Sequence, residues 1–427
     1  MERISSVVKV YKSHKVIGIL FLGFASGLPF LLTLGTLQAW LAGVGISKTT
    51  IGLFALATCP YSLKFLIAPA VDHIKIPFMT QRFGKRRAWI LLSQVFLLIS
   101  LIALGMSNPG ENIIYTFLMT SLVTFFAANQ DNAIEAYRIE TLTEQQIGPG
   151  ASASVIGFRI GMWVSGGGAL YLAAYYSWFL VYFIMSLFVI VGIIATLMLS
   201  EPESQEESVK LRQMGFVEYI KNHYKPAVQN LLKHNDWKLI FIFIILFKVA
   251  DAALNTMSIP FLLETGFSMV EIANIAKSFG IVAMITGGFI GGILLYHYSI
   301  INNLILSTVL LMVSSLMFMA QAYVGYDKSL LVATMGIENL ACGLSATALI
   351  AYISQICPRK NLATNFAIYS SYVSLARIGI SSVAGWMADS MSWISFYMLI
   401  GLLCIPCLLF LSFFSDRLIK KQSRVAV

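Results

Sequence analysis

Apolar segments long enough to cross a membrane follow one another along almost the whole chain of 427 residues. A membrane-spanning helix needs roughly 20 predominantly apolar residues, and 58% of the residues are hydrophobic while only 11% are charged. This pattern excludes a soluble domain and predicts an all-α polytopic membrane protein with twelve transmembrane helices. The expected spans are 16–40, 50–72, 88–107, 112–137, 151–173, 177–199, 238–262, 270–296, 300–322, 329–353, 362–388 and 393–415.

The positions of the basic residues predict that both termini are cytoplasmic. Cytoplasmic loops carry an excess of Lys and Arg. With the N-terminus inside, 22 of the 29 basic residues fall in cytoplasmic segments, and only Lys48 and Lys328 fall in outside loops. The net charge of +9 therefore reflects membrane topology, and nucleic-acid binding need not be invoked. The other five basic residues lie within the expected spans: Lys64, Arg159, Lys248, Lys277 and Arg377.

The longest polar stretch, residues 200–237, divides the spans six and six. It is predicted to be a cytoplasmic linker between an N-terminal six-helix bundle (residues 1–199) and a C-terminal six-helix bundle (residues 238–416). Residues 417–427 are expected to form a cytoplasmic tail.

The two halves also repeat one another at matching places. Gly45-Ile-Ser47 recurs as Gly266-Phe-Ser268, Ala133-Ile-Glu-Ala-Tyr137 as Ala348-Leu-Ile-Ala-Tyr352, and Arg159-Ile-Gly161 as Arg377-Ile-Gly379, at offsets of 221, 215 and 218 residues. Two such halves are the plan of the major facilitator fold, with substrate held midway between them. The repeat aligns Glu135 with Ile350, so we expect the charges of the fourth span in one half only.

Pairs of glycines four residues apart predict close helix packing, because small residues let helix backbones approach one another. The pairs are Gly23 and Gly27, Gly157 and Gly161, and Gly288 and Gly292.

The most informative polar residues lie on one stripe of the fourth span: Gln130, Asp131, Glu135 and Arg138. Helical positions i, i+4 and i+7 share a face, so the three charged residues are expected to point together into a protein interior, a water-filled cavity or the membrane surface. A charge near the bilayer centre costs about 2.5 to 3.5 kcal/mol on insertion scales. Asp131 and Glu135 are candidates for proton carriage, because a carboxylate in a poorly solvated cavity binds a proton more readily. The alternative is a static ion pair of Asp131 with Arg138 or Arg159.

Other polar residues in the spans are candidates for binding a polar solute. Lys248 and Asp251 are three apart, so they either neutralise each other or face the transport pathway, where Asp251 would also carry protons. Lys64 is favoured because Pro60 and Pro69 interrupt the second span and leave irregular backbone, which prefers a polar cavity. The substrate-binding candidates are Lys64, Lys248, Lys277, Gln38, Asn129 and Gln130.

Distinctive strings run through most of the chain: Leu22-Gly-Phe-Ala-Ser-Gly-Leu-Pro29, Lys64-Phe-Leu-Ile-Ala-Pro69 with Asp72, Gly84-Lys-Arg-Arg87, Gln130-Asp-Asn-Ala-Ile-Glu-Ala-Tyr-Arg138, Gly157-Phe-Arg-Ile-Gly161, Phe247-Lys-Val-Ala-Asp251 and Gly385-Trp-Met-Ala-Asp389. Together they resemble the AmpG-type anhydromuropeptide permeases, a branch of the major facilitator superfamily. The resemblance implies proton-driven import of cell-wall fragments across the bacterial inner membrane for peptidoglycan recycling. The chain departs from the family pattern at Glu135, where the family usually has Asp, and at Asn132, where it prefers an apolar residue.

A gating role is predicted for several charged residues. Asp72 with Arg86 and Arg87 resembles the superfamily signature of the loop between the second and third spans, which would close the cytoplasmic gate. Arg159 and Arg377 occupy equivalent places in the two halves, and Arg138 could gate through a breakable ion pair with Glu135.

These features favour a secondary transporter that works by alternating access. A nucleophile triad, a phosphate loop, zinc spacing and a dinucleotide fingerprint are all missing from the sequence, so we expect no enzyme activity, no metal and no cofactor, with the proton gradient as energy source. The expected partners are a glycopeptide solute, protons and membrane lipid, and the expected state is a monomer. One alternative is transport of another anionic solute, such as an acyl-coenzyme A. The other is a non-transporting membrane sensor or enzyme.

Overall fold

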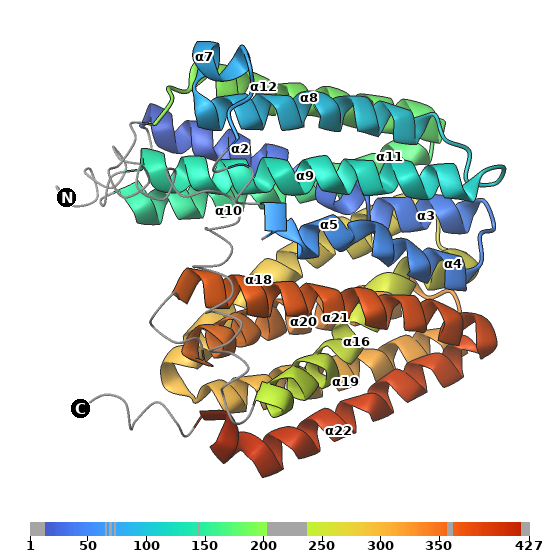
Figure 1. Ribbon diagram of the computed structural model, residues 1–427. Helices are drawn as coiled ribbons and strands as arrows, with labels where there is room; N and C mark the ends of the chain where they lie inside the picture. The colour runs from blue at the N-terminus through green and yellow to red at the C-terminus, as the bar shows by residue number, and fades with distance from the viewer. Residues whose placement is uncertain are drawn as a thin grey trace, which may run out of the picture. The chain divides into compact units, whose positions relative to one another are not determined.

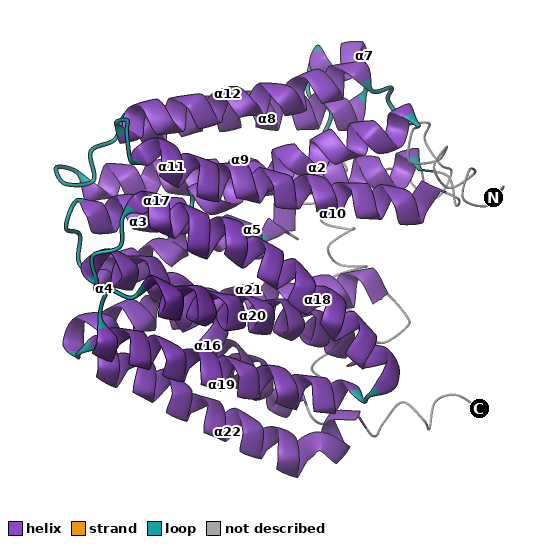
Figure 2. Cartoon of the chain, turned by 180° about the vertical axis from the view of Figure 1, so that it is seen from behind, coloured by secondary structure: helices purple, strands orange, loops and turns teal. Residues whose placement is uncertain are grey.

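The structure is a computed structural model that describes residues 13–64, 66, 67, 71, 74–142, 146–202, 237–356 and 362–419. These residues form helices joined by turns and loops, and this part of the chain contains no strand (Figure 2). The predicted all-α class is therefore confirmed.

The helices follow the order of the expected spans (Figure 1). In the first half they are α2 (His14–Leu32), α3 (Gly35–Gly43), α4 (Lys48–Leu53), the 3-10 helix η1 (Phe54–Thr58), α5 (Cys59–Ser62), α7 (Met79–Phe83), α8 (Lys85–Gly105), α9 (Ile113–Thr141), α10 (Ile147–Trp163), the π-helix η3 (Val164–Gly168), α11 (Ala169–Ala173) and α12 (Trp178–Met198). In the second half they are α16 (Trp237–Glu264), α17 (Met269–Glu271), the π-helix η5 (Ile272–Phe279), α18 (Gly280–His297), α19 (Ile300–Val324), α20 (Lys328–Ile356), α21 (Leu362–Ser390) and α22 (Trp393–Ile419).

Ten helical segments of the described residues are long and apolar enough to cross a membrane. The two remaining expected spans are the second and the eleventh. The eleventh is α21, a helix of 29 residues. The second is a broken helix in the part from Lys48 to Ser62 that the structure describes.

The second span breaks where the sequence predicts an interruption. Between Lys48 and Ser62 the chain forms α4, η1 and α5 in place of one continuous helix. Pro60 lies at the start of α5, where its missing N–H is tolerated but a continuous helix is not. Pro69 lies outside the described residues, so only the break at Pro60 is confirmed.

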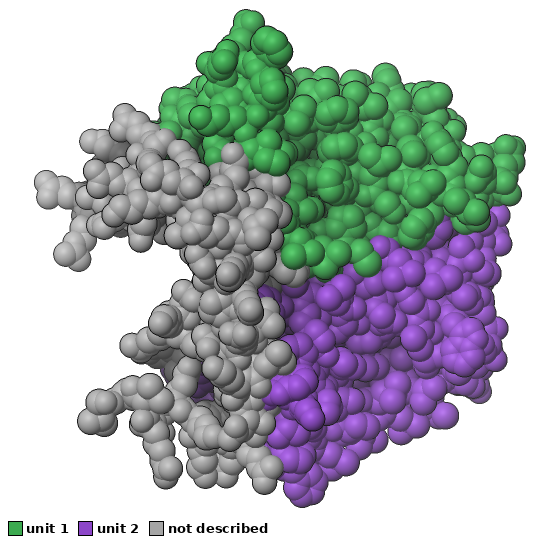
Figure 3. All heavy atoms as spheres, viewed as in Figure 1, with its two compact units in different colours: residues 1–40, 57–222 green, residues 41–56, 223–427 purple. Residues whose placement is uncertain are grey.

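The chain forms two compact units (Figure 3). Unit 1 comprises residues 1–40 and 57–222, and unit 2 comprises residues 41–56 and 223–427. The segment 41–56 therefore clusters with the second half of the chain, although it lies within the first half of the sequence. The bundle and linker boundaries expected from the sequence stay predictions.

Within unit 1, glycines bring α2 and α10 into close contact. A Cβ atom added to Gly27 would lie 2.0 Å from the carbonyl oxygen of Phe158, and one added to Gly157 would lie 2.0 Å from that of Leu20. Cβ atoms added to Gly23 and Gly161 would also lie within 2.4 Å of backbone oxygens across this contact. The packing predicted for these two glycine pairs is confirmed.

Within unit 2, a different glycine pair packs α18 against α20. A Cβ atom on Gly287 would lie 2.1 Å from the Leu340 carbonyl oxygen, and one on Gly343 would lie 2.0 Å from that of Met284. By contrast, a Cβ atom on Gly292 would meet nothing within 4 Å. The prediction of tight packing is wrong for Gly292. Gly288 does lie at the contact, because a Cβ atom on Gly343 would lie 2.8 Å from the Gly288 backbone nitrogen.

The segment 41–56 docks on α21 inside unit 2. A Cβ atom on Gly385 would lie 2.3 Å from the Lys48 carbonyl oxygen, so the two backbones are nearly in contact. The Asp389 carboxylate accepts hydrogen bonds from the backbone N–H groups of Lys48 at 3.1 Å and Thr49 at 2.6 Å. Asp389 thus satisfies amides at the start of α4 that a helix leaves unpaired.

Candidate functional site

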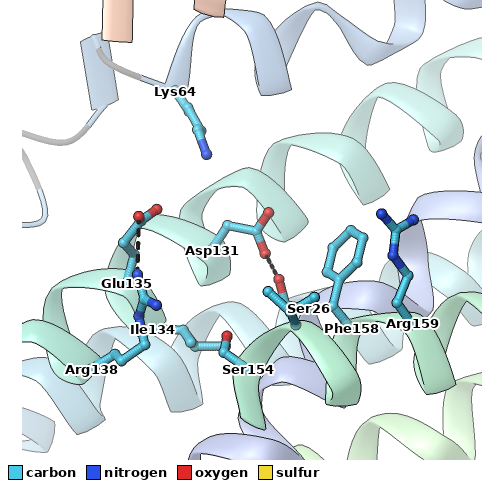
Figure 4. A pocket seen from close by; sticks show the side chains of 10 residues that line it. Ser26, Lys64, Asp131, Ile134, Glu135, Arg138, Ser154, Phe158 and Arg159 are labelled. Atoms are coloured by element: carbon cyan, nitrogen blue, oxygen red, sulfur yellow. Dashed lines mark hydrogen bonds and ion pairs between the residues drawn. The ribbon is translucent and has the colours of Figure 1, made fainter. Parts of the chain in front are cut away.

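A pocket of about 280 Å³ lies within unit 1 (Figure 4). Helices α2, α9 and α10 supply most of its walls, and Lys64 reaches it from the broken second span. The lining residues are Ser26, Lys64, Asp131, Ile134, Glu135, Arg138, Ser154, Val155, Phe158 and Arg159. Charged groups therefore gather in one cavity of an otherwise apolar bundle.

Asp131, Glu135 and Arg138 all line this pocket from α9. The prediction that they share a helix face is confirmed. The Arg138 guanidinium lies 3.5 Å from Glu135 Oε1, in an i, i+3 ion pair on the half-exposed side of the helix. Arg138 is thus paired with Glu135 rather than with Asp131.

The Asp131 carboxylate is bound by a hydroxyl group. Ser26 on α2 donates a hydrogen bond from Oγ to Asp131 Oδ1 (Figure 4). Within the described residues Asp131 forms no ion pair, but its carboxylate interacts electrostatically with Lys64 and with Glu135. Of the arrangements weighed from the sequence, the static pair of Asp131 with Arg138 does not occur here.

The backbone of Lys64 is fixed by a hydrogen bond, whereas its side-chain ammonium group is available to bind a solute. Asn132 Nδ2 donates a hydrogen bond of 2.8 Å to the Lys64 carbonyl oxygen. The Lys64 side chain is partly buried and points toward the pocket (Figure 4). Among the described residues its Nζ has no hydrogen bond and no ion pair. A cation of this kind can bind an anionic group of a solute.

Arg159, the basic residue of α10, also lines the pocket. Its Nη1 lies 3.7 Å from Met162 Sδ, one turn further along the same helix. The Phe158 ring lies beside it and packs against Phe30 with centroids 5.9 Å apart. The Phe158 ring thus contributes an aromatic surface to the pocket lining.

The amide side chains predicted to bind substrate lie elsewhere. Gln130 is fully buried and donates from Nε2 to the Ala25 carbonyl oxygen at 2.9 Å, so it joins α9 to α2. Asn129 donates to Phe125 of its own helix at 3.0 Å. Gln38 is buried in α3, and its Oε1 has no hydrogen-bond partner. None of the three lines the pocket described above.

Of the predicted gating residues, the two loop arginines are fixed within unit 1. Arg86 binds Glu140 through Nε at 3.1 Å and Nη2 at 2.7 Å, an ion pair that the sequence analysis missed. Arg87 donates to the backbone carbonyls of Thr196 and Leu197, each at 2.9 Å. Asp72 lies outside the described residues.

Unit 2 contains a second polar cluster, around Asp251 of α16. Lys248 Nζ lies 2.5 Å from Asp251 Oδ2, and both side chains are largely buried. Asn255 Nδ2 and Cys342 Sγ each donate to Oδ1 at 3.2 Å. Arg377 of α21 interacts electrostatically with the same carboxylate. Lys248 and Asp251 therefore neutralise each other, as one of the two sequence interpretations states.

Glu338 of α20 is a further membrane-embedded carboxylate that the sequence analysis missed. It is 3% exposed. Its Oε2 accepts from Asn339 at 2.6 Å, and its Oε1 lies 3.5 Å from Cys342 Sγ. It interacts electrostatically with Lys277 of η5. Glu338 does not align with Asp131 or Glu135 in the repeat, so the alignment of Glu135 with the apolar Ile350 is unaffected, but the tenth span carries a carboxylate of its own. The signal was an acidic residue inside the span 329–353, the same signal that identifies Asp131.

Solved structures with the same fold are transporters. The chain is similar to the nucleoside transporter NupG, with a TM-score of 0.69 and 16% identity, over 94% of this chain and 98% of that one. It is also similar to a D-xylose-proton symporter, with a TM-score of 0.68 and 13% identity, over 95% and 98% of the two chains. This fold, together with a match to the Major Facilitator Superfamily, defines a multi-pass membrane transporter.

The family is established by sequence. The family model described as Major Facilitator Superfamily matches residues 19–337. The chain belongs to this superfamily and, within it, to the AmpG-type permeases.

Three curated relatives show how far the similarity extends. The anhydromuropeptide permease of Escherichia coli is 32% identical over 95% of this chain and 81% of the relative. AmpG 4 of Rickettsia conorii is 31% identical over 96% and 99% of the two chains. AmpG 3 of Rickettsia prowazekii is 34% identical over 93% and 96%.

Proposed function

We propose that this chain imports anhydromuropeptides together with protons across the bacterial inner membrane, by alternating access, for peptidoglycan recycling. The relationship to the Escherichia coli permease supports the choice of solute. The distribution of basic residues supports an orientation with both termini in the cytoplasm. The transporter works as a monomer surrounded by lipid, with the proton gradient as its energy source and no cofactor.

The observation that carries the proposal is the pair of Asp131 and Lys64 in the unit 1 pocket. Asp131 has a hydroxyl donor and no ion pair among the described residues, so its carboxylate can take up and release a proton. Ionisable residues inside a membrane commonly mark proton relays and solute pathways. Lys64 supplies a positive charge in the same pocket for a carboxylate of the cell-wall fragment.

Asp131 and Lys64 also explain how transport of the proton and transport of the solute would be coupled. When Asp131 is ionised, it attracts the Lys64 ammonium and competes with the solute carboxylate for it. When Asp131 is protonated, the competition ends and Lys64 binds the solute. Proton binding and solute binding then support each other, as reciprocity of coupled binding requires.

Uptake into liposomes that contain the purified full-length chain tests this function. Labelled anhydromuropeptide is offered with and without an inward proton gradient. Accumulation that depends on the gradient is expected, and uptake that is absent or indifferent to the gradient would contradict the proposal. Excess unlabelled acyl-coenzyme A in the same assay tests the alternative solute, because a competitor for the pocket lowers uptake of the label.

A further inference from the structure

Unit 2 repeats the pairing of a lysine with a carboxylate that unit 1 shows. In unit 1, Asp131 of the fourth span interacts electrostatically with Lys64 of the second. In unit 2, Glu338 of the tenth span interacts electrostatically with Lys277 of the eighth. The second and eighth spans correspond in the six-plus-six repeat, and so do the fourth and tenth. Both halves thus place one lysine and one carboxylate on corresponding helices, although at positions that do not align in the repeat.

Lys277 lies inside, and Lys64 lies shortly after, a segment whose backbone departs from α-helical geometry. Lys64 follows the 3-10 helix η1 and the short α5. Lys277 lies inside η5, a π-helix of eight residues. At membrane depth such backbone is tolerated where it is buried in protein or lines a polar cavity, and π-helical segments frequently occur at functional sites. The irregular backbone is a second feature that singles out Lys277.

The two carboxylates of unit 2 differ in what neutralises them. Asp251 has the Lys248 ammonium at 2.5 Å and donors from Asn255 and Cys342. Glu338 has only the Asn339 amide and a contact with the Cys342 thiol, and no ion pair among the described residues. Asp251 is therefore fixed as an anion, whereas Glu338 is a buried carboxylate that a proton could neutralise.

The thiol of Cys342 adds to this difference between Asp251 and Glu338, because it lies close to both carboxylates. Its sulfur lies 3.2 Å from Asp251 Oδ1 and 3.5 Å from Glu338 Oε1. A thiol has a single proton to donate, and the shorter contact assigns that proton to Asp251. An ionised Glu338 would then face the sulfur lone pairs and the negative Asp251, whereas a protonated Glu338 can donate to the sulfur.

Lys277 completes the arrangement. No hydrogen bond or ion pair of its Nζ occurs within the described residues, although Glu338 is near enough to interact electrostatically. A protonated Glu338 leaves the ammonium free for an anion, and an ionised Glu338 attracts it. The charged and titratable groups that interact around Glu338 come from α16, η5, α20, α21 and α22: Lys248, Asp251, Lys277, Cys342, Arg377 and Tyr397.

We propose that Glu338 and Lys277 form a proton-gated anion site in unit 2. A proton from the outside water binds Glu338, Lys277 then binds a carboxylate of the solute, and loss of the proton to the inside lets Glu338 attract Lys277 and displace that carboxylate. The anion part rests on the proposed uptake of an anionic solute. The proton part does not depend on the identity of the solute.

Infrared difference spectra of the full-length protein in lipid, recorded between acidic and alkaline buffer, test the proton part without any solute. The acid-minus-alkaline spectrum of the wild type is expected to contain carbonyl bands of protonated Glu338 and protonated Asp131, and Glu338→Gln should lose the Glu338 band while the Asp131 band stays. Asp251→Asn is the matched control and should keep both bands. An unchanged spectrum in Glu338→Gln would overturn the proposal.

The same spectra test the role of Lys277. Because a nearby cation stabilises the ionised carboxylate, Lys277→Gln should move loss of the Glu338 band to higher pH, while Lys277→Arg should leave it near the wild-type value. A purely structural role for Lys277 would not move it, and an unmoved band in Lys277→Gln would overturn the gating. If the band behaves as expected but labelled anhydromuropeptide is not transported, the proposed solute is wrong and the site stands.

Binding of labelled anhydromuropeptide tests the anion part. Wild-type affinity is expected to fall as pH rises. In an Asp131→Asn background, which removes the proton site of unit 1, adding Glu338→Gln should abolish the remaining pH dependence. Lys277→Gln should bind about tenfold or more weakly, the size expected for a lost charge-assisted hydrogen bond. Full affinity in Lys277→Gln would remove Lys277 from solute binding.

Discussion

Asn132 donates a hydrogen bond to the backbone of Lys64, so a side chain of α9 fixes the broken second span beside the pocket. Asn132 is also one of the two positions at which the chain departs from the AmpG-type pattern. Asn132 directly follows Asp131 in α9. The same helix turn therefore positions both the Asp131 carboxylate and the backbone of Lys64.

Replacing Asn132 with Leu should weaken solute binding. The change leaves the Lys64 carbonyl without its donor, and a hydrogen bond of this kind contributes about 0.5 to 1.5 kcal/mol. We expect the KM for uptake to rise about two- to tenfold with little change in protein yield. Asn129→Leu is the control, since Asn129 bonds only within α9. Equal KM values for wild type and Asn132→Leu would show that this bond does not position Lys64.

Asp131→Asn should abolish accumulation driven by the proton gradient, because the amide cannot bind and release a proton. Exchange of labelled for unlabelled solute across the membrane needs no net proton movement and should persist. Ser26→Ala removes the hydroxyl donor but keeps the carboxylate, so it should retain accumulation at a reduced rate. Gradient-driven accumulation by Asp131→Asn would exclude Asp131 as the proton carrier.

Arg86→Gln should destabilise unit 1. Arg86 is 5% exposed and its ion pair with Glu140 is largely buried, and removing one partner of a buried pair costs about 3 to 5 kcal/mol. A thermal melt in detergent should show a lower Tm, and the double variant Arg86→Gln with Glu140→Gln should recover part of it. If Arg86→Gln melts like the wild type but transports poorly, the gating role predicted from the sequence gains support over the structural one.

Gly27→Ala should also lower the Tm. The new methyl group would lie 2.0 Å from a backbone oxygen of α10, and overpacking of this kind typically costs about 1 to 3 kcal/mol. Gly292→Ala introduces the same methyl group where nothing lies within 4 Å, so it should melt like the wild type. Similar Tm values for both variants would mean that α2 and α10 separate without cost.

The fold was predictable because the signal is long and repeated. Each span is a run of apolar residues, and in lipid such a run must satisfy its backbone hydrogen bonds internally, as a helix does. The break in the second span follows from a single residue, Pro60. The contact partner of a helix face is harder to predict. Gly287 and Gly288 both meet α20, whereas a Cβ atom on Gly292 of the same helix would meet nothing within 4 Å.

The site was predictable where charge is rare. Asp131, Glu135, Arg138, Lys64 and Arg159 stand out in apolar segments, and all line one pocket. The role of an amide side chain is harder to predict. Gln130 could donate its hydrogen bonds to a solute or to a neighbouring backbone, and only the structure shows that its partner is the Ala25 carbonyl on α2.

Glu338 was overlooked for another reason. The tenth span was identified as an apolar run, and its similarity to Ala133–Tyr137 of the fourth span begins at Ala348, ten residues after the acidic residue. The partner of Arg86 was missed because Glu140 is 54 residues further along the chain, a separation that no local spacing reveals.

The docking of residues 41–56 on α21 has a mechanical consequence for the second span. The chain passes from unit 2 to unit 1 between Leu56 and Ala57, inside the 3-10 helix η1. A rotation of either unit would therefore act as a torque on this short stretch, whose tighter turns have poorer hydrogen bonds than an α-helix and yield more easily. Lys64 follows η1 shortly along the chain, so a movement of residues 41–56 with unit 2 would be transmitted through the backbone to the lysine of the pocket.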